Sequence, residues 1–529
     1  MRARYLWFVC CLGLLGCGDD GADASSGKDA SADGSLTDGP IADGSLNVDA
    51  SWADGSTGDA AGLDGGAHDG SSPADTGAAD GPVFAGLFAF PSAVGWGKDA
   101  TGGRGGEVRK VTTLNNSGAG SLRAAWEAPG KATIVFEVAG TITVSSPIKP
   151  TGDKTVAGET AFRNGGHGIT IRRDGTYGDS AVSGHMNNSI IRFMRFRPGP
   201  GSAPECCGDA VTILSGQNII FDHCSFSWST DEIFNAWGPV KHVTMQNSIF
   251  SSPLAFATHT YTTDPNHASY KTDHSKAWLS GGSNTDASKS ASHFSLYNTI
   301  FAHSKDRNPA IGGAAPEFEL VNTLLYNWGS FGSNAGSFGT KAINIINHYA
   351  INGSNTSSQR YPIAAQSNAK LFVAGIFNAK KNSDDWSGVG CETGCGAGYM
   401  TQPAPVAWRA ASPFNYPLKN EPVLTAAQIK SKVLANAGAN LFVDGTDKQL
   451  FADINNGTGS LIDDPSEVGG WPSLANLSSV PLDTDDDGMP DAYETAQGLN
   501  KNSAADGAAD SGDGYTHLEK YLFTLTGGT

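Results

Sequence analysis

The segment FELVN at residues 318–322 recurs 25 residues later as INIIN at residues 343–347. Apolar residues alternate in both segments, and such alternation is typical of β-strands. Four more segments share the register, at 220–224 (IFDHC), 243–247 (VTMQN), 294–298 (FSLYN) and 371–375 (LFVAG), and the fifth positions advance by 23, 51, 24, 25 and 28 residues. A period in the twenties, without helical stretches between strands, predicts a solenoid of stacked coils.

The fifth position of this repeat is asparagine in four segments: Asn247, Asn298, Asn322 and Asn347. Amide side chains stacked in this way can hydrogen-bond to their neighbours above and below, as they do in stacked parallel strands. The pattern predicts an all-β chain that forms a parallel β-helix over residues 84–475. A leucine-rich repeat is the alternative, but its LxxLxL pattern is missing.

Three further features refine this architecture. The 51-residue step indicates an insertion within residues 255–290, and insertions in solenoids lie on one face that often carries the functional site. The stretch GSLRAAW at 120–126 predicts a short helix that closes one end of the solenoid. Residues 425–435 predict an amphipathic helix with Ile429, Val433 and Leu434 on one side.

The N-terminal region predicts export. Arg2 and Arg4 precede an apolar run at 5–15 that is too short to span a bilayer, and the run ends in Leu-Leu-Gly-Cys at 14–17. This order is typical of a bacterial lipoprotein signal over residues 1–17 with lipidation of Cys17, and an ordinary signal peptide is the alternative. We expect a chain anchored at the bacterial outer membrane or cell surface, or secreted.

The formal net charge of −18 is concentrated at the two ends of the chain. Residues 18–83 contain 14 Asp and one Lys among Gly, Ala and Ser, with too little apolar surface to offset the entropy of ordering, so we expect a disordered linker. Residues 476–529 are also acidic, whereas residues 84–475 are nearly neutral. Cys391 and Cys395 are close enough in sequence to form a small-loop disulfide.

The acidic tail, residues 476–529, carries the motif DTDDDGMPDAYE at 483–494. It matches the twelve-residue calcium loop with Gly488 at the sixth position and carboxylates at Asp483, Asp485, Asp487, Asp491 and Glu494. A degenerate second copy follows at 510–519. The tail resembles the EF-hand-like calcium repeats of dockerin-like and thrombospondin type 3 modules, and we expect its Ca²⁺ to be structural.

Blocks in the predicted β-helix carry a resemblance to a known family. They are FPSAVGWG at 90–97, TGGRGG at 101–106, GSLR at 120–123, IRF at 191–193 with RPG at 197–199, DHCSFSWS at 222–229 and RNP at 307–309. In this order they resemble the pectate lyases of polysaccharide lyase family 1 over most of residues 84–472. The resemblance implies that the β-helix is right-handed and single-stranded. It also implies a calcium-dependent enzyme that cleaves α-1,4-linked galacturonan by β-elimination.

The resemblance also implies a set of site residues. It places calcium at Asp209, Asp231 and Asn235, where Asn235 replaces a carboxylate and leaves more of the charge balance to Glu232. It assigns proton abstraction to Arg307, but arginine ordinarily stays protonated, so stabilisation of the enediolate is the alternative role. The second arginine of the family motif falls at Gly312 and is absent. Lys276 matches a catalytic-site lysine that binds substrate, with Lys271 in an alternative register.

Two other functions remain open. A carbohydrate-binding or adhesive surface protein could use the same scaffold without turnover, and Gly312 and Asn235 favour it. A polygalacturonase-like hydrolase needs clustered carboxylates, but Asp463 and Asp464 lie outside the repeat. We expect an acidic polysaccharide as partner, a membrane contact through the lipid, no nucleic acid and a monomeric chain.

Overall fold

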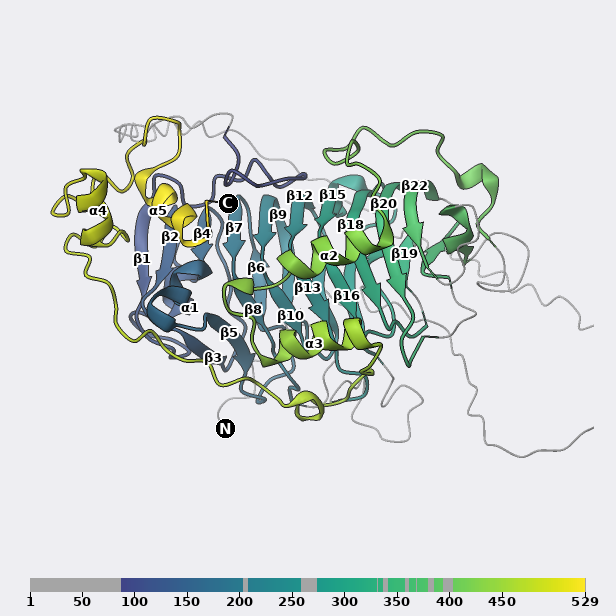
Figure 1. The fold of residues 1–529 in the computed structure, drawn as a ribbon, viewed down its shortest axis with the longest axis horizontal. Coiled ribbons are helices and arrows are strands. Elements are labelled where there is room, and N and C mark those ends of the chain that lie inside the picture. The colour runs from purple at the N-terminus through teal and green to yellow at the C-terminus, as the bar shows by residue number, and fades with distance from the viewer. Residues whose placement is uncertain are drawn as a thin grey trace, which may run out of the picture. The chain divides into compact units, whose positions relative to one another are not determined.

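The computed structural model describes residues 87–202, 208–257, 274–330, 332–335, 341–356, 361–367, 369–378, 385–392 and 403–528. They form a β-helix in which the pairings between named strands, β1 to β23, are parallel (Figure 1). The predicted fold class is confirmed. The signal region 1–17, the linker 18–83 and the cysteines at 206, 207 and 395 lie outside the described residues, while Cys391 is disulfide-bonded.

The strands stack into three faces. The first face contains β1 (Glu107–Val111), β2 (Ala132–Phe136), β4 (Lys154–Ala157), β7 (Ser189–Arg192), the end of β9 (Val211–Asp222), β12 (Val240–Gln246), β15 (Ser292–Tyr297), β18 (Glu317–Tyr326), β20 (Lys341–Ile351) and β22 (Ala369–Phe377). The second face contains β3 (Gly140–Val144), β5 (Ile169–Arg173), β8 (Met194–Phe196), β10 (Ser225–Ser227), β13 (Ile249–Ser251), β16 (Ile300–Ala302) and the ends of β18, β20 and β22.

The third face positions the candidate site. It contains β6 (Val182–His185), the start of β9, β11 (Glu232–Trp237), β14 (Lys276–Gly281), β17 (Ala310–Ile311), β19 (Ser333–Ala335), β21 (Ile363–Ala365) and β23 (Val389–Cys391). The predicted insertion is found between β13 and β15. Residues 258–273 of it lie beyond the part of the chain that the structure describes.

The register of the repeat is as predicted except in its first segment. Val243 pairs with Ile219, so the segment opposite VTMQN is 219–223 rather than 220–224. His223, not Cys224, therefore occupies the repeat position, and the first step is 24 residues instead of 23. The prediction was wrong here because Ile219, Ile220 and Phe221 form an unbroken apolar run, which does not show which side chains point inward.

The asparagine ladder is confirmed in two places. The Asn298 amide donates to Asn247 Oδ1 at 3.1 Å, and the Asn347 amide donates to Asn322 Oδ1 at 2.9 Å. The four asparagines also have φ between 51° and 59°. Asparagine tolerates this left-handed conformation better than other residues with a side chain, so the same residue type serves both the sharp turn and the ladder.

The interior is filled by apolar side chains that stack from coil to coil. Phe196, Phe226, Phe250 and Phe301 form one column whose successive ring centroids lie 5.0 Å apart. Offset aromatic stacking of this kind adds to the free energy gained by removing the rings from water. Regular stacking therefore holds successive coils in register.

Helices lie at the β1 end and along one side of the β-helix (Figure 1). The predicted end helix is α1 (Leu122–Glu127), in which Ser121 accepts from the Ala124 N–H at 3.2 Å. The predicted amphipathic helix is α2 (Ala426–Asn436), which buries Ile429 and Val433. The other helices are α3 (Gly445–Asn456), α4 (Asp491–Gln497), α5 (His517–Leu525), η1 (Gly158–Gly165), η2 (Ala287–Lys289), η3 (Asp385–Gly388), η4 (Val406–Trp408), η5 (Asn440–Phe442) and η6 (Pro465–Val468).

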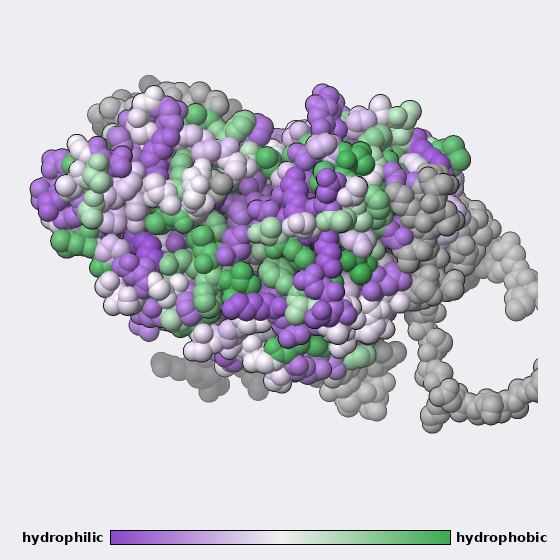
Figure 2. Space-filling view, in the orientation of Figure 1, coloured by the Kyte–Doolittle hydropathy of each residue, from purple (hydrophilic) through white to green (hydrophobic). Residues whose placement is uncertain are grey.

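The surface is mixed in polarity. On the side of the molecule drawn in Figure 2, small hydrophobic patches are separated by hydrophilic side chains. Among the described residues, none of the helices combines the length and the hydropathy needed to span a membrane.

Candidate active site

Most of the predicted site residues converge on the third face. Asp209 lies just before the β9 strand, Asp231 just before β11, and Glu232 begins β11. Parallel pairing places Glu232 beside Lys276, and a further parallel bridge places Lys276 beside Asp306. Residues far apart in sequence thus become neighbours because equivalent positions of successive coils stack directly on one another.

Asp209 is buried among polar partners. Its Oδ1 accepts from the Glu232 N–H at 3.0 Å, and its Oδ2 accepts from the Thr212 hydroxyl at 2.6 Å. Burial, and then the negative charge of Asp231, raise the pKa of the Asp209 carboxyl well above its usual value. Asp209 and Asp231 are thus two carboxyl groups close together and shielded from solvent. A cation beside them would stabilise their ionised, negatively charged forms.

A second group of side chains meets beside Asp209. Asp231, Glu232 and His274 are all buried, and one potential ligand atom from each lies within 4.8 Å of the others. His274 Nε2 is hydrogen-bonded to Asp231 Oδ1. Sequence reasoning missed His274, although its position two residues before Lys276 at the start of a coil is a signal that could have found it.

Asn235 lies on β11 between its neighbours on the adjacent coils, where it pairs with Thr212 and Leu279. Its side-chain Oδ1 is buried and has no hydrogen-bond partner among the described residues. An unsatisfied buried amide oxygen is costly, and a cation is one partner that would satisfy it.

The basic residues of the site form ion pairs with its acids. Arg307 Nη1 pairs with Glu232 Oε1, and Arg307 Nε lies 4.0 Å from Asp306 Oδ1. Lys276 Nζ lies 3.7 Å from the same Asp306 oxygen. The Arg307 backbone has φ of 59°, a region that arginine seldom adopts and that is frequent at functional sites.

Two family positions do not contribute side chains here. The backbone N–H of Gly312 donates to Ser280 O at 2.8 Å, and glycine brings no guanidinium to this position. Lys271 lies outside the described residues. Asp222 is buried and pairs with Arg192 at 2.9 Å, a contact inside the β-helix wall. Asp463 accepts from the Phe256 N–H and Asp464 caps η6, so both carboxylates have backbone partners.

The tail has a separate acidic cluster that differs in part from the predicted loop. Asp485, Asp487 and Glu494 meet as predicted, and Asp506 joins them. Asp491 instead accepts from the Thr484 N–H at 2.8 Å and pairs with Lys501 at 3.0 Å. It begins α4, and this places its side chain beside the start of the loop. Asp483 pairs with Lys110 at 3.0 Å.

Comparison with known proteins identifies close relatives by sequence. The chain is 32% identical over 446 residues to a probable pectate lyase C of Aspergillus flavus, covering 83% of this chain and 94% of the relative. It is 34% identical over 456 residues to a probable pectate lyase C of Neosartorya fischeri, covering 85% and 97%. A pectate lyase 1 of Cryptomeria japonica is 30% identical over 171 residues, covering 30% and 45%. No family model matches the sequence.

Among solved structures, a pectate lyase from Bacillus sp. N165 in complex with trigalacturonate aligns with a TM-score of 0.40 and 16% identity, covering 65% of this chain and 98% of that one. A pectate lyase bound to a hexasaccharide aligns with a TM-score of 0.39 and 16% identity, covering 67% and 98%. Since fold similarity at this level does not establish function, the assignment depends on the sequence relatives. Their identity extends over most of both chains, and the chain therefore belongs to the pectate lyase family of polysaccharide lyases.

Proposed function

We propose that this chain is a calcium-dependent pectate lyase that cleaves α-1,4-linked galacturonan by β-elimination. The observation that supports this proposal most strongly is the cluster of Asp231 and Glu232, with Asp209 beside it and Arg307 paired to Glu232, on one face of a β-helix. Family membership supplies the reaction class, and the geometry supplies residues that suit each requirement of that reaction.

The residues fit a hard divalent cation. Asp209 and Asp231 place two carboxyl groups together in a buried setting, and the Asn235 oxygen has no other partner among the described residues. Oxygen ligands of this kind suit Ca²⁺. When bound, the cation would neutralise the uronate carboxylate and acidify the neighbouring C–H bond. His274 is a poor ligand for Ca²⁺, so we assign it the role of orienting Asp231 through their hydrogen bond.

Arg307 is the proposed catalytic group. Its ion pair with Glu232 stabilises the positive guanidinium, which suits a group that stabilises the negative enediolate. Glu232 also faces Asp231 and His274. If the Glu232 carboxylate gave up its ion pair with Arg307, the guanidinium would be released toward the substrate. In that state Arg307 either removes the proton beside the uronate carboxylate or stabilises the charge that forms when the proton leaves.

Lys276 and Arg307 together supply local positive charge for a polyanionic substrate. Lys276 lies one coil from Glu232 and within 3.7 Å of Asp306. The chain as a whole is acidic at −18, so long-range attraction cannot come from net charge. We propose that Lys276 binds the substrate. Lys271, in the neighbouring insertion, takes this role if it is the residue that corresponds to the family's lysine.

One experiment separates the candidate functions. The purified chain is incubated with polygalacturonate and Ca²⁺, and the ultraviolet absorbance of the unsaturated product is followed together with new reducing ends. A lyase produces both signals in equal molar amounts. Reducing ends without absorbance would identify a hydrolase. Tight polysaccharide binding with neither signal would identify the non-catalytic carbohydrate-binding protein, which the absence of an arginine at Gly312 favours.

We also propose that the chain is exported as a bacterial lipoprotein anchored through Cys17. In this arrangement residues 18–83 tether the domain at 84–475, and residues 476–529 bind a structural cation. Expression in a bacterial host with labelled palmitate tests the anchor. The wild-type chain should carry label in the membrane fraction, and Cys17→Ser should not. Label retained by Cys17→Ser, or absent from wild type, would refute lipidation at this cysteine.

A further inference from the structure

We propose that a divalent cation held by Asp485, Asp487, Glu494 and Asp506 locks the C-terminal tail onto the first coils of the β-helix and thereby caps that end of the fold. This role is independent of the lyase activity. The proposal adds Asp506 to the predicted ligands and assigns the tail the role of a cap on the β-helix.

The four carboxylates form a built site rather than a solvated acidic surface. Ligand atoms from all four residues lie within 4.8 Å of one another. Glu494 is 0% exposed, and neither of its carboxylate oxygens has a hydrogen-bond partner in the described residues. Asp487 is 3% exposed, and while its Oδ1 accepts from the Met489 N–H at 2.8 Å, its Oδ2 has no partner.

Asp506 completes the group from a different part of the chain. Its Oδ2 accepts from the Asn500 N–H at 2.8 Å, and its Oδ1 is buried without a partner. Within the ranges described, no lysine or arginine forms an ion pair with any of the four acids. Several buried, uncompensated carboxylates are costly, and a hard cation with oxygen ligands is the partner that offsets this cost.

The local backbone is shaped for close approach. A Cβ on Gly507 would lie 2.4 Å from Asp487 Oδ2, so a larger residue at this turn would displace the Asp487 carboxylate from its observed position. The ligands come from the loop before α4, from α4 itself and from this turn. A cation at the cluster therefore joins three consecutive pieces of the tail.

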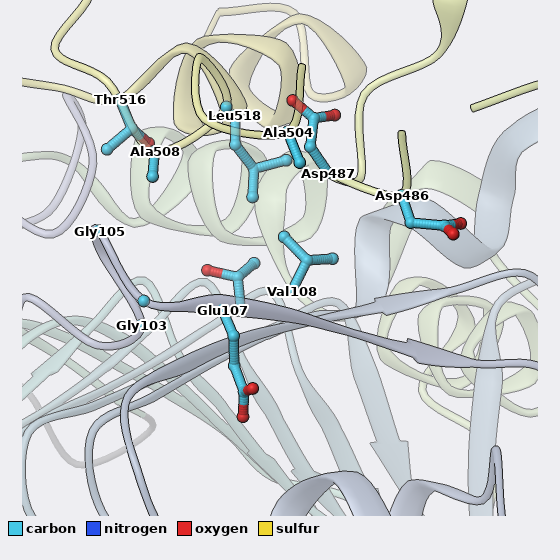
Figure 3. Close-up of a pocket in the computed structure, with 13 residues that line it drawn as sticks. Gly103, Gly105, Glu107, Val108, Asp486, Asp487, Ala504, Ala508, Thr516 and Leu518 are labelled. Carbon is cyan, nitrogen blue, oxygen red and sulfur yellow. The ribbon is translucent and has the colours of Figure 1, made fainter. Parts of the chain in front are cut away.

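The same pieces contact the first coils of the β-helix. The loop presents Asp483 and Asp486 to Lys110 on β1. Its Met489 packs with Val135 of β2 and Ala157 of β4. Figure 3 shows the Asp486 and Asp487 side of the tail facing Gly103, Glu107 and Val108 across a pocket of about 230 Å³. The loop conformation that gathers the carboxylates is thus the one that reaches β1.

The second helix of the tail strengthens this contact. Glu519 on α5 pairs with Arg104 at 2.8 Å, with side chains 9% and 0% exposed. Tyr521 accepts from Arg163 at 3.1 Å. The main β-helix core, by contrast, contains no residue after Leu477 among those described. Loss of the cation should therefore release the tail while leaving the later coils folded, because stability is local to each coil and its neighbours.

Hydrogen exchange of the full chain, followed by mass spectrometry in Ca²⁺ and in EDTA, tests the lock. We expect EDTA to accelerate exchange at least tenfold in residues 483–525 and in β1, and to leave β12, β15 and β18 unchanged. Unchanged exchange in 483–525 would overturn the proposal. So would equal acceleration in β12, β15 and β18, because the effect would then not be local to the cap.

Variants assign the effect to the cluster. Glu494→Gln and Asp506→Asn should show the fast tail exchange even in Ca²⁺, and each should need at least tenfold more Ca²⁺ for protection. Asp513→Asn, a matched exposed acid that pairs with Lys520 outside the cluster, should behave like wild type. Wild-type Ca²⁺ dependence in both cluster variants would contradict the ligand assignment. Slow exchange of β12 and β15 in each sample shows that the β-helix itself is folded.

Discussion

Glu232 is the residue on which the chemistry of the site converges. It pairs with Arg307, lies in the cluster with Asp231 and His274, and donates its backbone N–H to Asp209. Its own side chain is only 3% exposed. A single buried carboxylate thus couples the proposed catalytic arginine to the proposed cation site, so the two cannot be altered independently.

Substitution of Arg307 should abolish most activity without unfolding the chain. Arg307→Ala should lower kcat by about 10²- to 10⁴-fold, since a positioned proton-transfer or charge-stabilising group contributes about that much. Product absorbance on polygalacturonate measures this. Arg307→Lys keeps the positive charge and should recover part of the rate if the role is electrostatic. Full activity of Arg307→Ala would remove this residue from the mechanism.

The sequence predicted several site residues, and the structure explains which ones it missed. Asp209, Asp231 and Asn235 were predicted from the family resemblance, and the stacked coils place them at neighbouring strands of one face. His274 comes at the end of the insertion, where residues no longer obey the repeat. Asp506 lies outside the twelve-residue loop motif and reaches the tail cluster only because the chain turns back after α4. A motif confined to twelve consecutive residues cannot show that a later residue folds back to join the cluster.

At the scale of strands and helices, stacking decides which patterns can be read from sequence. The repeat was enough to predict the strands, the face on which they lie and the asparagine positions. The first segment was predicted one residue too late, because it lies in an unbroken apolar run. The α3 helix was not predicted from the sequence. It packs beside α2, where Leu450 and Ile454 cover Ile300 and Leu324 on the second face, and that contact is made only in the folded chain.

The β20 strand should give the fold a measurable dependence on pH. Burial lowers the pKa of His348 to about 4, so the folded chain keeps this imidazole neutral, whereas the unfolded chain protonates it below about 6.5. The contribution is complete above pH 6.5 and is lost as pH falls toward 4, by up to about 3 kcal/mol.

Urea unfolding at pH 7 and pH 4.5, compared between wild type and His348→Asn, tests this dependence. The variant should lose less stability than wild type over the same interval. An identical loss in the two proteins would show that His348 does not account for the pH dependence.

The contact between β8 and α3 should depend on a buried ion network. Arg197 pairs with Asp444 at 2.5 Å and with Asp447 at 2.7 Å, and these three side chains are at most 4% exposed. Arg197→Ala leaves two buried carboxylates without their main partner and should cost about 3–5 kcal/mol in the free energy of unfolding. The surface pair of Lys98 and Asp99 provides the control, and Lys98→Ala should cost less than about 1 kcal/mol. Equal losses would refute the distinction.

At the scale of the whole molecule, charge and cations are divided among separate regions. The β-helix is nearly neutral, while the acidic residues are concentrated in 18–83 and in the tail. Two carboxylate clusters lie in different parts of the described chain, one on the third face and one in the tail. We propose that the first serves the reaction and the second fixes the cap, so removal of cations should affect both catalysis and the end of the fold.

The most direct test of the central proposal is the initial rate of unsaturated product formation from polygalacturonate, measured in EDTA and then across a Ca²⁺ titration. Asp231→Asn is compared with wild type because EDTA alone would also release the tail. We predict no product in EDTA, recovery of the wild-type rate with Ca²⁺, and at least a tenfold higher Ca²⁺ requirement for Asp231→Asn. Full activity in EDTA, or the same Ca²⁺ dependence in both proteins, would contradict a calcium-dependent lyase centred on this site.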